Sequence, residues 1–195
     1  AMDKPHSKTA CWTPLWNPRY SGVGMEHLVL SAQSAESDIL GIDEDGVPFR
    51  MRYQLAWNER WELMTAQLFA FQSGVSRSLS LRSDGHGHWT DREGLPMPAL
   101  EGCVDIGIWP TPFTLPMPVR RSPLSIGERR RYSVAWVQGP ALTCRKRRMD
   151  YGRSDDDRYR FESLDGTHQD ADFQIDEAGL VIDCTRLFKR VRPPH

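Results

Sequence analysis

The chain has 195 residues, of which 25 are lysine or arginine and 26 are aspartate or glutamate. This length is enough for one domain that buries about 70% of the surface of its unfolded chain, so the fold needs neither a disulfide nor a metal. The near balance of charge excludes a whole-molecule field that steers the protein toward nucleic acid or an anionic membrane. The balance of charge does not exclude local basic patches.

The N-terminal residues 1–10 lack the apolar core of a secretory signal, and Ala1 before Met2 is typical of a residue left by tag cleavage. No run of eighteen apolar residues is present, so no integral membrane association is expected. The four cysteines form no Cys-x-x-Cys pair, which indicates free thiols and no zinc knuckle. We expect a single cytoplasmic domain over residues 1–195, with residues 1–10 as a flexible start.

Alternation with a period of two predicts strands along most of the chain, because successive side chains of a strand point to opposite faces. Between Phe49 and Trp57, one face carries Met51, Tyr53, Leu55 and Trp57. The next stretch is expected to place on one face Trp61, Leu63, Phe69 and Phe71. Shorter repeats follow in Leu79 with Leu81, Val134 with Trp136, Tyr159 with Phe161, and Phe173 with Ile175.

The connections between these stretches predict hairpins, since Asp-Gly dipeptides accept the positive φ of tight turns at Asp45-Gly46, Asp84-Gly85 and Asp165-Gly166. Seven prolines between residues 94 and 123 favour a long ordered loop, packed through apolar residues such as Ile106 and Phe113. No stretch has helical periodicity over three turns, so units of strand, helix and parallel strand are not expected.

These elements predict a mainly β fold with few short helices: a long antiparallel sheet that curls into a half-barrel, an open barrel or a sandwich. The interior of such a barrel is filled by side chains or holds one small ligand. The sequence does not decide between a filled interior and one that holds a ligand.

Large aromatic side chains are the first candidates for a binding site, because tryptophan stacks on sugars and packs on acyl chains. Trp12 and Trp89 lie beside turn residues and are candidates for lining a pocket. Trp57, Trp61 and Trp136 fit core positions in the predicted strands.

Charged clusters give weaker signals. Asp84, His86 and His88 share one side of an extended segment, as metal ligands do, but an exposed turn explains them better and we expect no metal. The basic runs at 129–131 and 145–148 fit a solvated, salt-bridged face better than a phosphate-binding stripe. Arg120 and Arg121 have two interpretations: a structural ion pair with Asp105, or recognition of an anionic head group.

Several blocks of the chain resemble the bacterial glycolipid-binding family, whose name rests on structural analogy. The most specific blocks are Thr111-Pro112-Phe113-Thr114 and Pro118-Val119-Arg120-Arg121, preceded by Gly102-Cys103-Val104-Asp105. Weaker matches are Glu26, the segment from Tyr53 to Trp61, Trp89, Tyr151 and the closing hairpin at 175–181. Family members usually carry Asn-Thr-Leu where this chain has Leu115-Pro116-Met117. The resemblance implies a half-barrel, similar to carriers of lipids and lipoproteins, around an apolar cavity.

We therefore expect a binding protein, without cofactor or catalytic motif, that holds a glycolipid, a fatty-acyl group or another amphipathic molecule on a concave sheet face. Its expected site residues are Trp12, Glu26, Tyr53, Trp57, Trp89, Asp105, Phe113, Arg120, Arg121 and Tyr151. One alternative is an enzyme that uses Glu26, Asp105 and the histidines as acid or base. Another is an interaction module without a ligand, whose exposed arginines engage an acidic partner.

Overall fold

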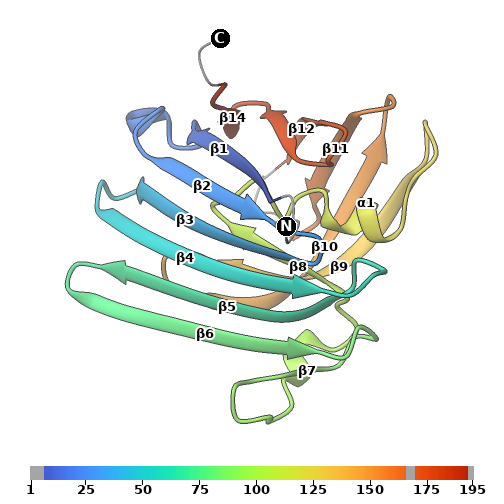
Figure 1. Ribbon diagram of the computed structural model, residues 1–195, viewed down its shortest axis with the longest axis horizontal. Coiled ribbons are helices and arrows are strands. Elements are labelled where there is room, and N and C mark those ends of the chain that lie inside the picture. Colours follow the sequence, from blue (N-terminus) through green and yellow to red (C-terminus); the bar gives the residue numbers. More distant parts are fainter. Residues whose placement is uncertain (1–6, 166–169, 193–195) are drawn as a thin grey trace, which may run out of the picture.

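The protein folds into one large, mostly antiparallel sheet, seen in a computed structural model that describes residues 7–165 and 170–192 (Figure 1). Its fourteen strands are β1 (Lys8–Pro14), β2 (Met25–Leu30), β3 (Ser34–Ile42), β4 (Pro48–Trp57), β5 (Leu63–Gln72), β6 (Val75–Ser83), β7 (Trp89–Thr90), β8 (Asp105–Trp109), β9 (Arg129–Gln138), β10 (Thr143–Arg153), β11 (Arg158–Ser163), β12 (Asp170–Ile175), β13 (Val181–Cys184) and β14 (Phe188–Arg190). In the described part of the chain, the helical elements are α1 (Met117–Arg121) and two 3-10 turns, Pro18–Tyr20 and Pro98–Leu100.

The strands follow the order β7-β6-β5-β4-β3-β2-β1-β14-β13-β12-β11-β10-β9-β8, so β1 and β14 join the two halves of the sheet. The pair of β8 with β9 is parallel, unlike the other pairs of the described strands. No ladder joins the edge strands β7 and β8 within these residues, so the sheet is open. The mainly β prediction is confirmed, whereas the expectation of a half-barrel or open barrel is wrong, because the sheet is neither closed nor strongly curled.

The face predicted for β4 is confirmed, with Met51, Tyr53, Leu55 and Trp57 all buried and Arg50, Arg52 and Gln54 all exposed. In β5 the prediction is wrong for two aromatics: Leu63 is buried, but Phe69 and Phe71 are exposed. The cause is a β-bulge, since Trp57 pairs with Leu63 and Ala56 with Thr65, leaving Met64 as an extra residue. One extra residue moves every later side chain to the opposite face.

The proline-rich segment contains more regular structure than the predicted loop. It forms β8, whose five residues are all buried, and the short helix α1. Ile106, Ile108 and Phe113 pack against the inner face of β1 to β6, together with Ala135 and Val137 of β9. The other side of β9, with Val134 and Trp136, packs in a second core with residues of β10 to β14.

Residues of β8, β9 and the segment after β8 fill the inner face of β1 to β6. The described part of the chain does not show the apolar cavity implied by the family resemblance. Leu115 and Met117 lie at positions that depart from the family pattern, and both are buried: Met117 in this filling and Leu115 in the second core.

Two predicted segments lie partly outside the described residues. Of the start expected to be flexible, residues 8–10 belong to β1, and residues 1–6, including the position of the tag remnant, lie outside the description. The turn predicted at Asp165-Gly166 extends into residues 166–169, which also lie outside it.

Candidate functional site

Glu26 is a carboxylate buried in the core, with 3% of its surface exposed. It belongs to β2, whose alternation turns Glu26, Leu28 and Leu30 inward and His27 outward. Register places Glu26 between Trp12 of β1 and Ile39 of β3. A strand position that normally carries an apolar side chain therefore carries an acid, which is costly unless its oxygens are hydrogen-bonded.

One oxygen of Glu26 is surrounded by donors. Oε1 accepts hydrogen bonds from the hydroxyls of Ser37 at 2.7 Å, Tyr53 at 2.6 Å and Thr111 at 2.8 Å. The other oxygen, Oε2, is buried and has no partner among the residues that the structure describes. Burial raises the pKa of Glu26 to about 7, although the three hydroxyls act to lower it. The carboxyl group therefore changes charge near neutral pH.

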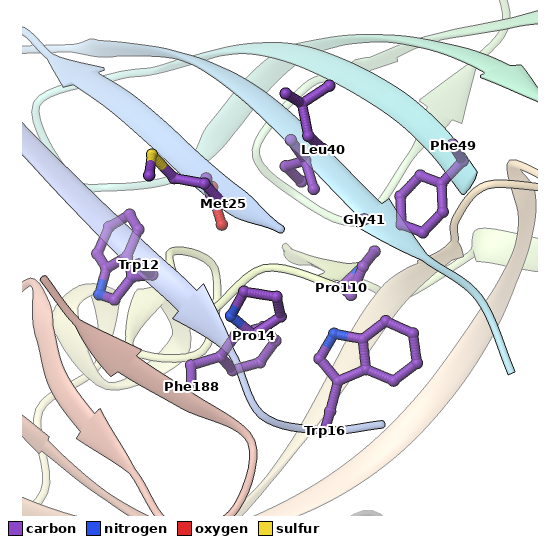
Figure 2. A pocket seen from close by; sticks show the side chains of 11 residues that line it. Trp12, Pro14, Trp16, Met25, Leu40, Gly41, Phe49, Pro110 and Phe188 are labelled. Atoms are coloured by element: carbon purple, nitrogen blue, oxygen red, sulfur yellow. The ribbon is translucent and has the colours of Figure 1, made fainter. Parts of the chain in front are cut away.

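Glu26 lines a small hollow whose other walls are mostly apolar (Figure 2). Four aromatic rings and two prolines contribute: Trp12, Trp16, Phe49, Phe188, Pro14 and Pro110. The free space is about 10 Å³, which suits one water molecule. Met25 and Leu40 form part of the wall and are 48% and 59% exposed, so the hollow reaches the surface beside these two residues. We call this space the Glu26 hollow.

A second unsatisfied polar group lines the same hollow. The indole nitrogen of Trp16 is buried and has no hydrogen-bond partner within the described residues. In Figure 2 this nitrogen faces the space enclosed by the labelled side chains. Trp16 is held by an edge-to-face contact with Trp109, with ring centroids 5.3 Å apart. The hollow thus combines an acceptor without a donor and a donor without an acceptor, and buried groups of this kind normally have partners.

Two of the expected site residues, Trp12 and Glu26, line the Glu26 hollow, and Tyr53 bonds directly to Glu26. Phe113 stacks on Tyr53 with ring centroids 6.3 Å apart and contacts Trp57, so both belong to the core behind the hollow. The buried Trp89 donates to the carbonyl oxygen of Cys103.

The remaining expected residues lie apart from the hollow. Tyr151 is buried in the second core. Arg121 makes a bidentate pair with Asp105, as the structural interpretation of these residues predicts. Arg120 lies with its guanidinium 3.7 Å from the ring centroid of Trp61 and donates to the carbonyl oxygen of Ala178.

The sequence did not point to Trp16, Phe49 or Phe188 as neighbours of Glu26. Phe49 and Phe188 lie in β4 and β14, which are far apart in the chain and meet only through the order of the sheet. Thr111 could have been chosen from the sequence, because it begins the Thr-Pro-Phe-Thr block that carries the family resemblance. Its hydroxyl donates to Glu26, and that of Thr114 accepts from the backbone of Ile108.

The other charged clusters have structural partners. His88 contacts Asp84 at 2.8 Å and Glu101 at 3.3 Å on the surface, and no group of three or more metal-ligating residues is found in the described ranges. Arg129 and Arg131 pair with Glu162 and Asp150, in keeping with a salt-bridged face. Of the candidate acids and bases, Glu26, Asp105 and His88 thus have different hydrogen-bond or ion-pair partners. No helix among residues 7–165 and 170–192 has the length and hydropathy needed to span a membrane.

Comparison with known proteins shows which family the chain is similar to. The family model described as "Putative glycolipid-binding" matches residues 13–190. The chain belongs to this family. Its fold is similar to the crystal structure of a DUF1089 family protein from Pseudomonas aeruginosa, with a TM-score of 0.82 and 40% sequence identity, over 85% of this chain and 91% of that one. No curated protein matches the chain. The matched residues of this glycolipid-binding family member include nearly the whole wall of the Glu26 hollow, from Pro14 to Phe188.

Proposed function

We propose that the protein binds a glycolipid or a similar amphipathic molecule, and that a hydroxyl of its head group enters the Glu26 hollow. The observation that carries this proposal is the pair of unsatisfied groups, Glu26 Oε2 and the Trp16 indole N–H, at one small space. A hydroxyl donates one hydrogen bond and accepts others, so a single hydroxyl can satisfy both. An ammonium group donates only and would leave the indole unpaired.

The walls of the hollow suit a sugar as well. Tryptophan and phenylalanine rings offer flat apolar surfaces for the C–H faces of a sugar ring, and Trp12 and Trp16 border the carboxylate. The free space has the size of one water molecule, so one hydroxyl fits into it and the rest of the ring stays at the mouth. In this proposal the ligand lies at the ends of strands β1 to β4, and not on the concave sheet face expected from the sequence.

The experiment is calorimetric titration with octyl glucoside below its critical micelle concentration, compared with the same glycoside methylated at every hydroxyl. We expect the free glycoside to bind and the methylated one to bind at least about tenfold more weakly, because a hydrogen bond to a charged group contributes about 1.5–3 kcal/mol. The substitution Glu26→Gln removes the unsatisfied acceptor and keeps the shape of the side chain, and Trp16→Phe removes the unsatisfied donor and keeps an aromatic ring.

Trp136→Phe is the matched control, since the indole nitrogen of Trp136 donates to Gln138 in the second core. It should leave binding unchanged while the other two variants lose about tenfold in affinity. Equal binding of both glycosides, or normal binding by both Glu26→Gln and Trp16→Phe, would refute the proposal. The cytoplasmic location stays a prediction from the sequence.

A further inference from the structure

A row of side chains crosses the outer face of β2 to β5, opposite the core. Register pairs Met25 with Leu40, Leu40 with Arg50, and Arg50 with Phe71. Phe69 lies two residues before Phe71 and points to the same side. Four of these positions carry large apolar side chains, which are 48% exposed at Met25, 59% at Leu40, 48% at Phe69 and 38% at Phe71. We call this set, together with Arg50, the outer patch.

The outer patch borders an open groove of about 570 Å³. Leu40, Phe69 and Phe71 contribute apolar walls, and the guanidinium of Arg50 lies 4.8 Å from the ring centroid of Phe71. Exposed apolar side chains gathered around one groove mark a site of interaction more often than isolated exposed residues do. The bulge at Met64 is what turns Phe69 and Phe71 to this face.

Charge around the groove is positive, although the whole chain carries a formal net charge of −1. The charged residues that line the groove are three arginines, Arg50, Arg52 and Arg77, and one acid, Asp38. Arg52 already pairs with Asp38 through two hydrogen bonds of 2.8 and 3.1 Å. Arg50 and Arg77 therefore present positive charge beside exposed aromatic rings, which is complementary to an anionic partner.

The outer patch is continuous with the mouth of the Glu26 hollow. Leu40 lines both the groove and the hollow, and its register partner Met25 lines the hollow. A surface that holds the patch therefore lies directly beside the opening through which a head group reaches Glu26.

We propose that the outer patch docks on the surface of an anionic lipid bilayer. Phe69, Phe71, Leu40 and Met25 enter the interfacial layer, and Arg50 and Arg77 contact lipid phosphates, the combination that holds peripheral proteins on membranes. A second copy of the chain fits less well, because a symmetric contact brings like-charged arginines together. The docking goes beyond recognition of a head group and does not depend on it.

The test is co-sedimentation of the full chain with vesicles of phosphatidylcholine alone, or with phosphatidylglycerol as about a third of the lipid. We expect binding to the anionic vesicles that is weaker on neutral vesicles and weakens as salt is added. Phe71→Ser and Arg50→Glu should each reduce the bound fraction several-fold. Both positions lie outside the Glu26 hollow, so titration with octyl glucoside should be unchanged in these variants.

The matched controls are Leu95→Ser, at a 62% exposed leucine in the loop after β7, and Arg158→Glu, at an exposed arginine of β11. Both should bind anionic vesicles as the unmodified protein does. The proposal is overturned if the unmodified protein stays in the supernatant, or if Phe71→Ser and Arg50→Glu sediment normally. A dimer in solution that these two substitutions dissociate would also overturn it, since the patch would then join two copies of the chain.

Discussion

Arg121 and Asp105 form a bidentate ion pair that ties the end of α1 to the start of β8, with N–O distances of 2.9 and 2.8 Å. The carboxylate is 1% exposed and the guanidinium side chain 22% exposed. Burial raises the pKa of Asp105, although the hydrogen bonds from Arg121 act to lower it. The pair holds the segment that fills the inner face of β1 to β6, so it is a structural element of the core.

Replacing Arg121 with methionine leaves a buried carboxylate without a partner. We expect a loss of about 3 kcal/mol in the free energy of unfolding at pH 7, because removing one member of a buried pair is strongly destabilising. The double variant Arg121→Met with Asp105→Asn should recover part of this loss. Urea denaturation measures both, and Arg52→Met serves as control because its pair with Asp38 is exposed and contributes less than about 1 kcal/mol. Equal effects of Arg121→Met and Arg52→Met would contradict this role.

Tyr53→Phe removes one of the three donors to Glu26 Oε1 and also the contact of 3.2 Å between the hydroxyls of Tyr53 and Thr111. We expect the pKa of Glu26 to rise further, because this hydrogen bond lowers it, and the protein to lose about 1–3 kcal/mol of stability at neutral pH. Carbon-13 NMR titration of the labelled carboxyl group measures the pKa. Tyr132→Phe is the control, since that hydroxyl donates to a backbone carbonyl oxygen, of Ser122. An unchanged Glu26 titration in Tyr53→Phe would count against the network.

The sequence predicted the faces of β4 because an uninterrupted alternation needs only local geometry. It failed in β5, where the bulge at Met64 depends on how β5 pairs with β4 and leaves no mark in the alternation itself. It also took residues 105–109 for part of a loop, because the surrounding prolines hide a strand whose one sheet partner, β9, lies more than twenty residues further along.

The candidate site was predictable only in part for a similar reason. Glu26 alternates with Leu28 and Leu30, which indicates an inward position from the sequence alone. Its donors come from β3, β4 and the segment after β8, and Trp16 lies outside any strand, so their meeting depends on the order and register of the whole sheet. Long-range register of this kind is set by tertiary packing and cannot be read from one strand.

The turn between β5 and β6 offers a stabilising substitution. Ser73 and Gly74 connect the paired residues Gln72 and Val75 with φ values of 51° and 77°, which is the geometry of a type I′ turn. Asparagine tolerates this conformation better than serine, so Ser73→Asn should raise the melting temperature by about 2 °C. Ser76→Asn, one residue inside β6, should produce no rise. Calorimetry that finds equal or lower melting temperatures for Ser73→Asn would refute the expected gain.

Glu26 gives the protein a specific dependence of stability on pH. Its pKa is about 7 in the folded chain against an ordinary value of 4.5, so between these values the folded state binds a proton that the unfolded state releases. Stability from this group is therefore fully present below about pH 4.5 and is lost as the pH rises through about 7. At about 1.4 kcal/mol for each pH unit between the two values, the loss is on the order of 3 kcal/mol.

Glu26→Gln isolates this effect, because glutamine keeps an acceptor for the three hydroxyls and cannot ionise. Relative to the Glu26→Gln variant, the unmodified protein should lose stability from pH 5 to pH 8 in urea denaturation, while other groups with raised pKa values, such as Asp105, cancel in the comparison. A ligand hydroxyl that donates to Oε2 stabilises the ionised form, so octyl glucoside should bind more tightly at pH 8 and restore part of the loss. Parallel stability curves for the two proteins would show that Glu26 does not titrate in this range.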